Sequence, residues 1–281
     1  MTIREIQASI QEGDSLKDIT QAYSEISLIR INAIRQSTER ARAFFDEITK
    51  IYSLVRQQAN PAHLGQKEFK KVKLVLTSNY HFYGHIDALV MDFFIKDIRD
   101  KQGDIIIVGQ GGARFLSANH FNYQFSNLKF KKDIPDKSEM NDLIKIVKNY
   151  TQVLVYFAKF KNILTQTPTI LDITQTQNQL TGSHPLNEPL FIFEPETKQI
   201  LDFFDGQIKD IILQQLFLEA ELARNSSRLI AMDQSQYNAN LYLKQQNRLL
   251  SVAKMSVENS KLIELLVSIT KSISINNKEI I

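Results

Sequence analysis

Helix-breaking residues are confined to the middle of this chain. All six prolines and eight of the nine glycines lie between Pro61 and Gly206. The first 60 residues hold only Gly13, and the stretch from Gln207 to the C-terminus holds neither residue type. Glycine costs about 1 kcal/mol and proline about 3 kcal/mol in a helix interior, so both ends are predicted to be long helices. The middle is predicted to be a globular body inserted between them.

Apolar residues in both end segments recur every three or four positions. This spacing is that of a coiled-coil seam, although the helices of an ordinary bundle share the period. The length of the segments favours a coiled coil, with the polar Asn259 either fixing the register or facing a partner protein. The run near the start is Ile19, Ala22, Ile26, Ile29 and Ala33, and the run near the end is Val252, Met255, Asn259, Leu262, Leu266, Ile269 and Ile273.

The charge of the chain is nearly balanced. Its 34 basic and 31 acidic residues give a formal net charge of +3, which excludes nucleic acid as the main partner. The first helix is locally basic, and two interpretations remain open, a solvated helix face or a face that meets an acidic protein surface. The basic residues in question are Arg30, Arg35, Arg40, Arg42, Lys50 and Arg56.

Composition also bounds the environment of the chain. It has no cysteine, which excludes disulfides and thiolate metal sites. No apolar run approaches the roughly 20 residues needed to span a membrane. The polar start, MTIREIQ, is not a signal peptide. We therefore expect a soluble cytoplasmic protein.

The middle of the chain reads as strands alternating with helices, which predicts a small α/β sheet. Ser138 is the expected N-cap of the second helix. The expected domains are residues 1–60, 68–196 and 200–275, which are an N-terminal coiled-coil helix, an inserted α/β domain and a C-terminal coiled-coil helix. Expected strands are 71–77, 104–108, 152–159, 167–173 and 190–193, expected helices are 85–99 and 138–150, and 180–188 is an expected loop.

Candidate chemistry is sparse. The turn Gly109-Gln110-Gly111-Gly112 follows a predicted strand, but it matches neither dinucleotide nor P-loop spacing, so no bound nucleotide is predicted. His81 and His85 are four residues apart, yet no third ligand accompanies them, and ordinary histidines are the better interpretation. We see no convincing pair of catalytic carboxylates. The sequence therefore predicts no catalytic residue, cofactor or metal.

Several short motifs, read in order, resemble the γ subunit of F-type ATP synthases. The match spans almost the whole chain, and the order and spacing of the motifs carry it. The C-terminal segment 226–232 (SSRLIAM) with Asn238-Ala239 is similar to the family's A-A-R-M-x-A-M followed by N-A. The other matching segments are Ile6 and Ile10 with 19–22 (ITQA), 155–160 (VYFAKF), 191–195 (FIFEP) and Ile200-Leu201.

Three segments depart from the family pattern. The family's S-D-x-G-L-C-G reads SNYHFYG at 78–84. Arg224 stands where the family usually has glutamate, four residues before Arg228. The family's R-Q-x-x-I-T falls on 254–259 (KMSVEN), where Lys254 lacks the planar fork of arginine. These changes indicate a distant or specialised member with altered contacts to the catalytic subunits.

The resemblance implies a fold and a role. The fold is an α/β chain in which N- and C-terminal helices form a long antiparallel coiled coil around an inserted small α/β sheet domain. The coil lies inside a hexamer of α- and β-type ATPase subunits, and the body meets an ε-like subunit and a membrane rotor ring. The chain itself is non-catalytic and peripheral to the inner face of the cell membrane. Expected partner contacts are Arg30, Arg35, Arg228, Met232, Lys254, Met255 and Asn259, and expected seam residues are Ile19, Ile26, Leu262, Leu266 and Ile269.

Two alternatives stay open. The first keeps the γ-like shaft but assigns it to a specialised F-type-like ATPase that drives gliding or surface machinery in place of a proton ring. The departures at 78–84 and Arg224 fit this reading. The second is a coiled-coil adaptor with no ATPase.

Overall fold

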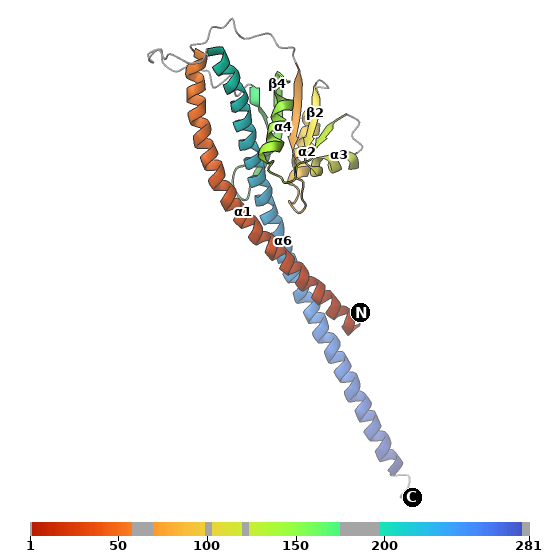
Figure 1. The fold of residues 1–281 in the computed structure, drawn as a ribbon. Coiled ribbons are helices and arrows are strands. Elements are labelled where there is room, and N and C mark those ends of the chain that lie inside the picture. The colour runs from red at the N-terminus through yellow and green to blue at the C-terminus, as the bar shows by residue number, and fades with distance from the viewer. Residues whose placement is uncertain (1, 58–69, 99–102, 120–123, 175–196, 277–281) are drawn as a thin grey trace. The chain divides into compact units, whose positions relative to one another are not determined.

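The computed structural model describes residues 2–57, 70–98, 103–119, 124–174 and 197–276. Two long helices stand out, α1 (Ile3–Gln57) and α6 (Thr197–Asn276), with a body of shorter elements between them in sequence (Figure 1). The chain divides into two compact units. One unit joins Met1–Glu25 to Met232–Ile281, and the other comprises Ile26–Ala231. None of the described helices is long and apolar enough to cross a membrane.

In the first unit, α1 and α6 pack as an antiparallel coiled coil. The least exposed positions of each helix are spaced three and four residues apart, as knobs-into-holes packing requires. Gly13 marks a close approach, because a Cβ there would lie 2.8 Å from Cδ2 of Leu243. The seam of α1 in this unit is Ile3, Ile6, Ile10, Gly13, Lys17, Thr20 and Ser24, and that of α6 is Met232, Gln236, Ala239, Leu243, Gln246, Leu250 and Ala253.

This seam corrects the predicted register of the first helix. Ile19 is 53% exposed and Ile26 is 43% exposed, whereas Thr20 and Ser27 are buried. Two stripes of the same period run along α1, so periodicity alone does not say which stripe faces α6. Between Gly13 and Ser24 the buried stripe consists of glycine and polar residues, and Gly13 lets the two helices approach closely. The stripe that contains Ile19 and Ile26 faces outward.

The predicted seam near the C-terminus is also corrected. In the antiparallel coil, Gly13 of α1 lies against Leu243 of α6. Helix α1 begins at Ile3, ten residues before Gly13, and the matching position on α6 is Ala253, ten residues after Leu243. Ala253 is the last half-buried residue among the described side chains of α6. Beyond it the described part of α1 offers nothing to pack against. Leu262, Leu266 and Ile269 are accordingly 58%, 62% and 53% exposed.

The second unit contains a five-stranded sheet with the order β3-β2-β1-β4-β5. All neighbouring strands are parallel except β4 and β5, which are antiparallel. In register, Leu74 lies opposite Ile106 on one side and Val155 on the other. The strands are β1 (Lys71–Leu76), β2 (Asp104–Val108), β3 (Ser126–Leu128), β4 (Gln152–Phe160) and β5 (Gln166–Asp172).

Each face of the sheet has its own core, because alternate side chains of a strand point to opposite faces. Leu74 and Leu76 pack with α4 (Lys137–Val147) and with the α6 segment from Ile208 to Ala220. Val75 packs on the other face with α2 (Ile86–Asp97) and α3 (Gln110–Ala118). The sheet is thereby covered on both sides, as expected for parallel strands.

The fold class is confirmed, and most elements of the body lie where the sequence placed them. Helix α3 was not predicted, because its glycines disfavour a helix. Packing against β2 requires a glycine in this helix, since a Cβ on Gly112 would lie 2.8 Å from Cγ2 of Ile107. Strand β3 was also missed. The N-cap of α4 is Asp136, which forms a capping box with Glu139, and not Ser138. The predicted strand 190–193 and the loop 180–188 lie outside the described residues.

Candidate functional site

Polar and charged side chains gather where strand β1 ends beside helix α6, within the second unit. We call this set the junction network and define it as Arg30, Ser78, Tyr83, Asp87, Asp133, Glu221, Arg224, Asn225 and Arg228. Such a concentration of buried charge is costly unless every member is paired and hydrogen-bonded.

Glu221 is the central acceptor of the junction network. Arg224, only 2% exposed, donates from Nε and Nη2 to Oε2 of Glu221 at 3.2 and 3.1 Å. Asn225 donates from Nδ2 to Oε1 at 2.8 Å, and Arg30 of α1 reaches the same oxygen from Nη1 at 3.4 Å. One carboxylate therefore binds a neighbouring turn of α6 and also ties α1 to α6.

Arg224 lies among carboxylates of the body as well as beside Glu221. Burial disfavours its charge, but Glu221, Asp133 and Asp87 more than offset this, so the pKa of Arg224 is raised. Burial raises the pKa of Asp87, while the positive charge of Arg224 acts in the opposite direction. Asp87 accepts hydrogen bonds from the backbone N–H of Ser78 at 3.2 Å and from its hydroxyl. Arg224 thus balances charge contributed by the body.

Asp133 fixes the loop after β1. It accepts from the backbone N–H of Asn79 at 2.5 Å and from the Tyr83 hydroxyl at 2.5 Å. Burial raises the pKa of Tyr83, with the charges of Glu221 and Asp133 adding to the effect. Tyr83 therefore stays a neutral donor at physiological pH.

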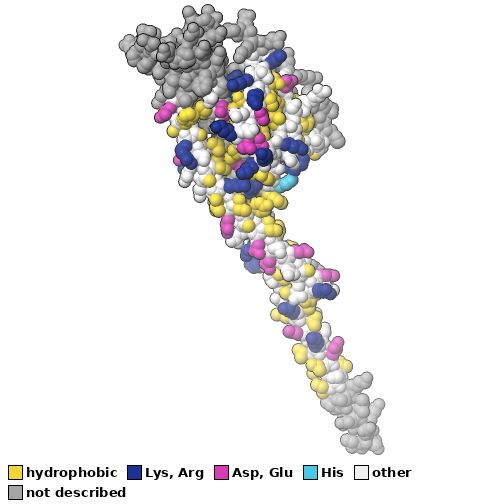
Figure 2. Space-filling view, in the orientation of Figure 1, with side chains coloured by type: hydrophobic (Ala, Val, Ile, Leu, Met, Phe, Trp, Pro, Cys, Tyr) yellow, Lys and Arg dark blue, Asp and Glu magenta, His cyan; other side chains and the backbone are white. Residues whose placement is uncertain are grey.

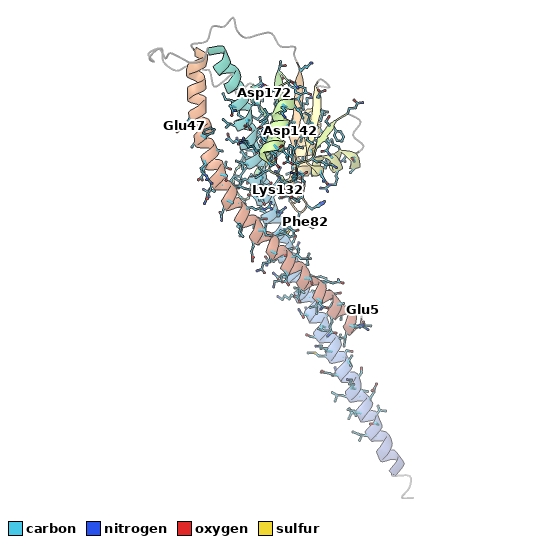
Figure 3. All side chains as sticks on the ribbon, in the orientation of Figure 1. Glu5, Glu47, Phe82, Lys132, Asp142 and Asp172 are labelled. Atoms are coloured by element: carbon cyan, nitrogen blue, oxygen red, sulfur yellow. The ribbon has the colours of Figure 1, made fainter. Side chains whose placement is uncertain are left out.

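Two residues of α6 hold the same loop from the other side. The Ser227 hydroxyl donates to the carbonyl of Tyr83 at 2.9 Å. Arg228 donates from Nη2 to the carbonyl of His81 at 3.1 Å, and its guanidinium carbon lies 3.8 Å from the centre of the Tyr83 ring. Between these anchors Phe82 adopts a positive φ of 67° and is 60% exposed. Phe82 and Lys132 lie at the same end of the body (Figure 3).

The backbone amides of Gly109, Gly111 and Gly112, at the start of α3, already have hydrogen-bond acceptors within the chain. The N–H of Gly109 donates to Leu128 O at 3.0 Å, that of Gly111 to Ser78 O at 2.8 Å, and that of Gly112 to Thr77 Oγ1 at 2.9 Å. A phosphate bound at a helix N-terminus needs such donors. Gly109 has a positive φ of 96°, and a Cβ there would lie 2.5 Å from Thr77 O. Both the backbone conformation and the close packing therefore require glycine at this position.

The structure describes two of the five histidines, His81 and His85. His81 lies with Nε2 3.1 Å from Nη1 of Arg114, and His85 is the N-cap residue of α2. Among the described residues, no group of three histidine, cysteine, aspartate or glutamate side chains could hold a metal ion.

The predicted partner-contact residues fall into two groups. Arg228 and Met232 are buried within the chain, which differs from their predicted role as surface contacts. The others lie at least partly at the surface: Arg30 pairs with Glu221, Arg35 pairs with Glu39 at 3.4 Å, and Lys254, Met255 and Asn259 are exposed.

Sequence reasoning singled out Arg224 as a departure but missed its partners. Glu221 lies three residues earlier on the same helix face, and this spacing is a readable signal for an ion pair. Asp87 and Asp133 carry no such signal. They come from distant parts of the chain, and only the sheet topology brings them to α6.

The described structure defines a class of protein. It joins a two-helix coiled coil to a small α/β body, and its polar cluster binds its own elements together. The fold class is therefore an α/β domain inserted in sequence between two long helices.

Comparison with known proteins agrees. Residues 2–256 match the ATP synthase family, and the chain belongs to that family. The ATP synthase gamma chain of Staphylococcus saprophyticus is 25% identical over 260 residues, which cover 85% of this chain and 88% of that one. The gamma chain of Staphylococcus haemolyticus is 21% identical over 256 residues, with the same coverage.

Solved structures share the fold at low sequence identity. The rotor of the Euglena gracilis mitochondrial ATP synthase has a TM-score of 0.61 and 12% identity, covering 90% of this chain and 98% of that one. The central stalk and c-ring structure of the Tetrahymena thermophila mitochondrial ATP synthase contains a chain with a TM-score of 0.56 and 16% identity. The match covers 77% of this chain and 98% of that one.

Proposed function

We propose that this chain is the central rotor shaft of an F-type rotary ATPase. It couples ATP hydrolysis or synthesis in a hexamer of α- and β-type subunits to its own rotation. The observation that carries the proposal is the match to the ATP synthase family over residues 2–256, with a fold of the same architecture as ATP synthase rotors. Catalysis and nucleotide binding belong to the partner subunits.

The surface of the first unit supports a shaft that runs in a protein sleeve. Large apolar side chains remain exposed on its helices, and hydrophobic side chains are visible along the helical part in Figure 2. Contiguous exposed apolar surface on a monomer indicates a protein interface. These exposed residues include Leu16, Ile19, Val252, Met255, Leu262, Ile263, Leu266 and Ile269.

Further partners follow from the same role. The body meets an ε-like subunit and a membrane rotor ring, which place the chain at the inner face of the cell membrane through its complex. Lys254, Met255 and Asn259 face the catalytic subunits from the exposed part of α6, and Arg35 does so from α1.

Native affinity purification of this chain, followed by mass spectrometry of the bound proteins, tests the proposal. We expect α- and β-type subunits together with a rotor-ring subunit. Purification without any ATPase subunit would overturn the rotor function and leave a coiled-coil adaptor.

A second candidate is the γ-like shaft of a specialised rotary ATPase that performs other mechanical work, such as gliding. Arg224 and the 78–84 loop, which depart from the family pattern, are both part of the junction between body and α6. Recovery of α- and β-type subunits with unfamiliar proteins and no ring subunit would favour this candidate over a standard synthase.

A further inference from the structure

We infer that the coil of the first unit opens on its own in the free chain and is held closed by the apolar sleeve of its partner subunits. The inference rests on the proposed rotor function, because the sleeve is that of the α- and β-type subunits. It adds that assembly completes the folding of the coil. Two features of the first unit carry it, a seam with little apolar packing and a large exposed apolar surface.

The first unit buries few apolar side chains. Among its described residues, four apolar side chains are buried and fifteen large ones are exposed, whereas the second unit has 36 buried and ten exposed. The four are Ile6, Met232, Ala239 and Leu243. In proteins, most helix stability comes from tertiary packing. The coil therefore has much less hydrophobic stabilisation than the body.

The seam also contains buried polar atoms that lack partners. The Oγ atom of Ser24 and the Oε1 atom of Gln246 are buried without a hydrogen-bond partner. Thr20 is 3% exposed, and its hydroxyl donates to the carbonyl of Lys17 in its own helix at 2.8 Å, so this bond does not join α1 to α6. A buried polar group without a partner has given up its hydrogen bonds to water, and opening of the coil restores them.

These features predict that the first unit opens before the body unfolds. Proteins open in cooperative units, and units with few buried apolar contacts open at the lowest free energy. The first unit is compact in itself and contains none of the strands of the sheet. Residues 3–25 of α1 should therefore separate from α6 while the five-stranded sheet stays intact.

The exposed surface indicates what closes the coil. Between residues 252 and 269, α6 exposes nine large apolar side chains. The charged residues of this stretch lie three and four positions apart on one stripe and carry no net charge: Lys254, Glu258, Lys261 and Glu264. A wide apolar face without net charge fits an apolar protein surface. An anionic membrane or a nucleic acid would require a basic face.

The same kind of surface continues around the coil itself. Leu16 and Ile19 of α1 are exposed, and so are Leu241 and Leu249 of α6. A sleeve fitted around the closed coil contacts both helices at once, whereas the open form presents them separately. A partner that binds the closed form better shifts the equilibrium toward it.

Hydrogen exchange of the full chain, alone and assembled with α- and β-type subunits, tests the inference. In the free chain, amides of residues 7–25 and 232–253 should exchange at least about a hundredfold faster than those of β1 and β4, because the coil opens without the sheet. Assembly should slow the coil amides by about a hundredfold or more, because the sleeve binds the closed form. Coil exchange in the free chain as slow as that of the strands would overturn the inference.

Two matched variants test the role of the seam. Gln246→Leu removes an unpartnered Oε1 atom from the seam, and Gln245→Leu makes the same change at the exposed neighbouring position. In the free chain, Gln246→Leu should slow exchange of the coil amides about tenfold, because no buried oxygen is then left without a partner at this site. Gln245→Leu should leave the coil unchanged, and neither variant should alter exchange in the strands. Equal effects of the two variants on the coil would contradict a weak seam.

Sedimentation of the free chain distinguishes the sleeve from a second copy of the chain. We expect a monomer, and a dimer whose coil exchanges slowly would overturn the assignment to partner subunits. If the purified chain binds no ATPase subunit, the proposed function fails and the sleeve fails with it, while fast coil exchange would still establish the opening. Slow coil exchange in the free monomer would overturn the inference whatever the chain binds.

Discussion

At the scale of single residues, this chain relies on a charge that its family pattern would not predict. Arg224 stands at the family's glutamate position, and its surroundings fit that reversal, because Glu221, Asp87 and Asp133 all lie near it. A single substitution is thus accommodated by carboxylates from three parts of the chain.

Restoring glutamate at position 224 should therefore destabilise the protein. Arg224→Glu places a further carboxylate in a buried cluster of acids, and breaking a buried pair costs about 3–5 kcal/mol. Urea unfolding measures the loss. Arg35→Glu on the exposed face of α1 should cost no more than about 1 kcal/mol, because it replaces an exposed pair with Glu39 by a like-charge pair of the same spacing. Equal effects of the two variants would show that Arg224 is not needed to balance charge.

Gly13 tests the close approach of the two helices. Gly13→Leu should lose about 1–3 kcal/mol by overpacking against Leu243. That loss exceeds the roughly 0.8–1.0 kcal/mol that a better helix former than glycine gains. Ala8→Leu, on the exposed face of the same helix, should be nearly neutral. Helical circular dichroism during urea unfolding reports both, and a stabilising Gly13→Leu would contradict the observed seam.

Tyr150 gives a prediction about pH. Its hydroxyl donates to Asp104 at 2.6 Å, and this hydrogen bond, with some desolvation, raises the pKa of Tyr150 to about 12. The contribution of this bond to stability should be complete below pH 10 and lost as the pH rises through about 12. Titration of tyrosine absorbance should show one fewer high-pKa tyrosine in Asp104→Asn, and an unchanged titration curve would refute the assignment.

At the scale of elements, the two long helices and most of the sheet were predictable, and the face of the coil was not. The absence of proline and glycine fixes where long helices form, and alternating apolar runs locate strands such as β2. The α1 stripes containing Ile19 and Thr20 share one period, so only the three-dimensional contacts show which is buried. Helix α3 was not predicted, because its glycines lower the helix propensity of the segment. They are present because a larger side chain would not fit between the elements packed there.

The exposed end of α6 makes an element-scale prediction. Leu262→Asp should leave the isolated chain folded, with a change of less than about 0.5 kcal/mol, because Leu262 is 58% exposed. The same variant should impair assembly with the α- and β-type subunits, because a charge would then enter an apolar sleeve. Chemical unfolding and pull-down measure the two effects. Strong destabilisation of the isolated chain would mean that Leu262 is packed within it.

At the scale of the whole molecule, the sequence motifs sufficed to indicate the family. The three-dimensional structure was needed to show which residues of the candidate site contact one another. The Arg228 motif was readable, but its function in holding the 81–83 loop was not, since the loop lies about 145 residues away in sequence. The account that results is of a rotor in which α1 keeps isoleucines exposed outside the coil seam. Its body is tied to α6 by hydrogen bonds from Ser227 and Arg228 to the 81–83 loop.

The most direct test of this account is to observe the body while the complex hydrolyses ATP. A bead on the Ser138→Cys variant, in hexamers fixed to a surface, should rotate in one direction only when ATP is supplied. Hydrolysis at the normal rate with a bead that stays still or diffuses in both directions would contradict the proposed rotor function.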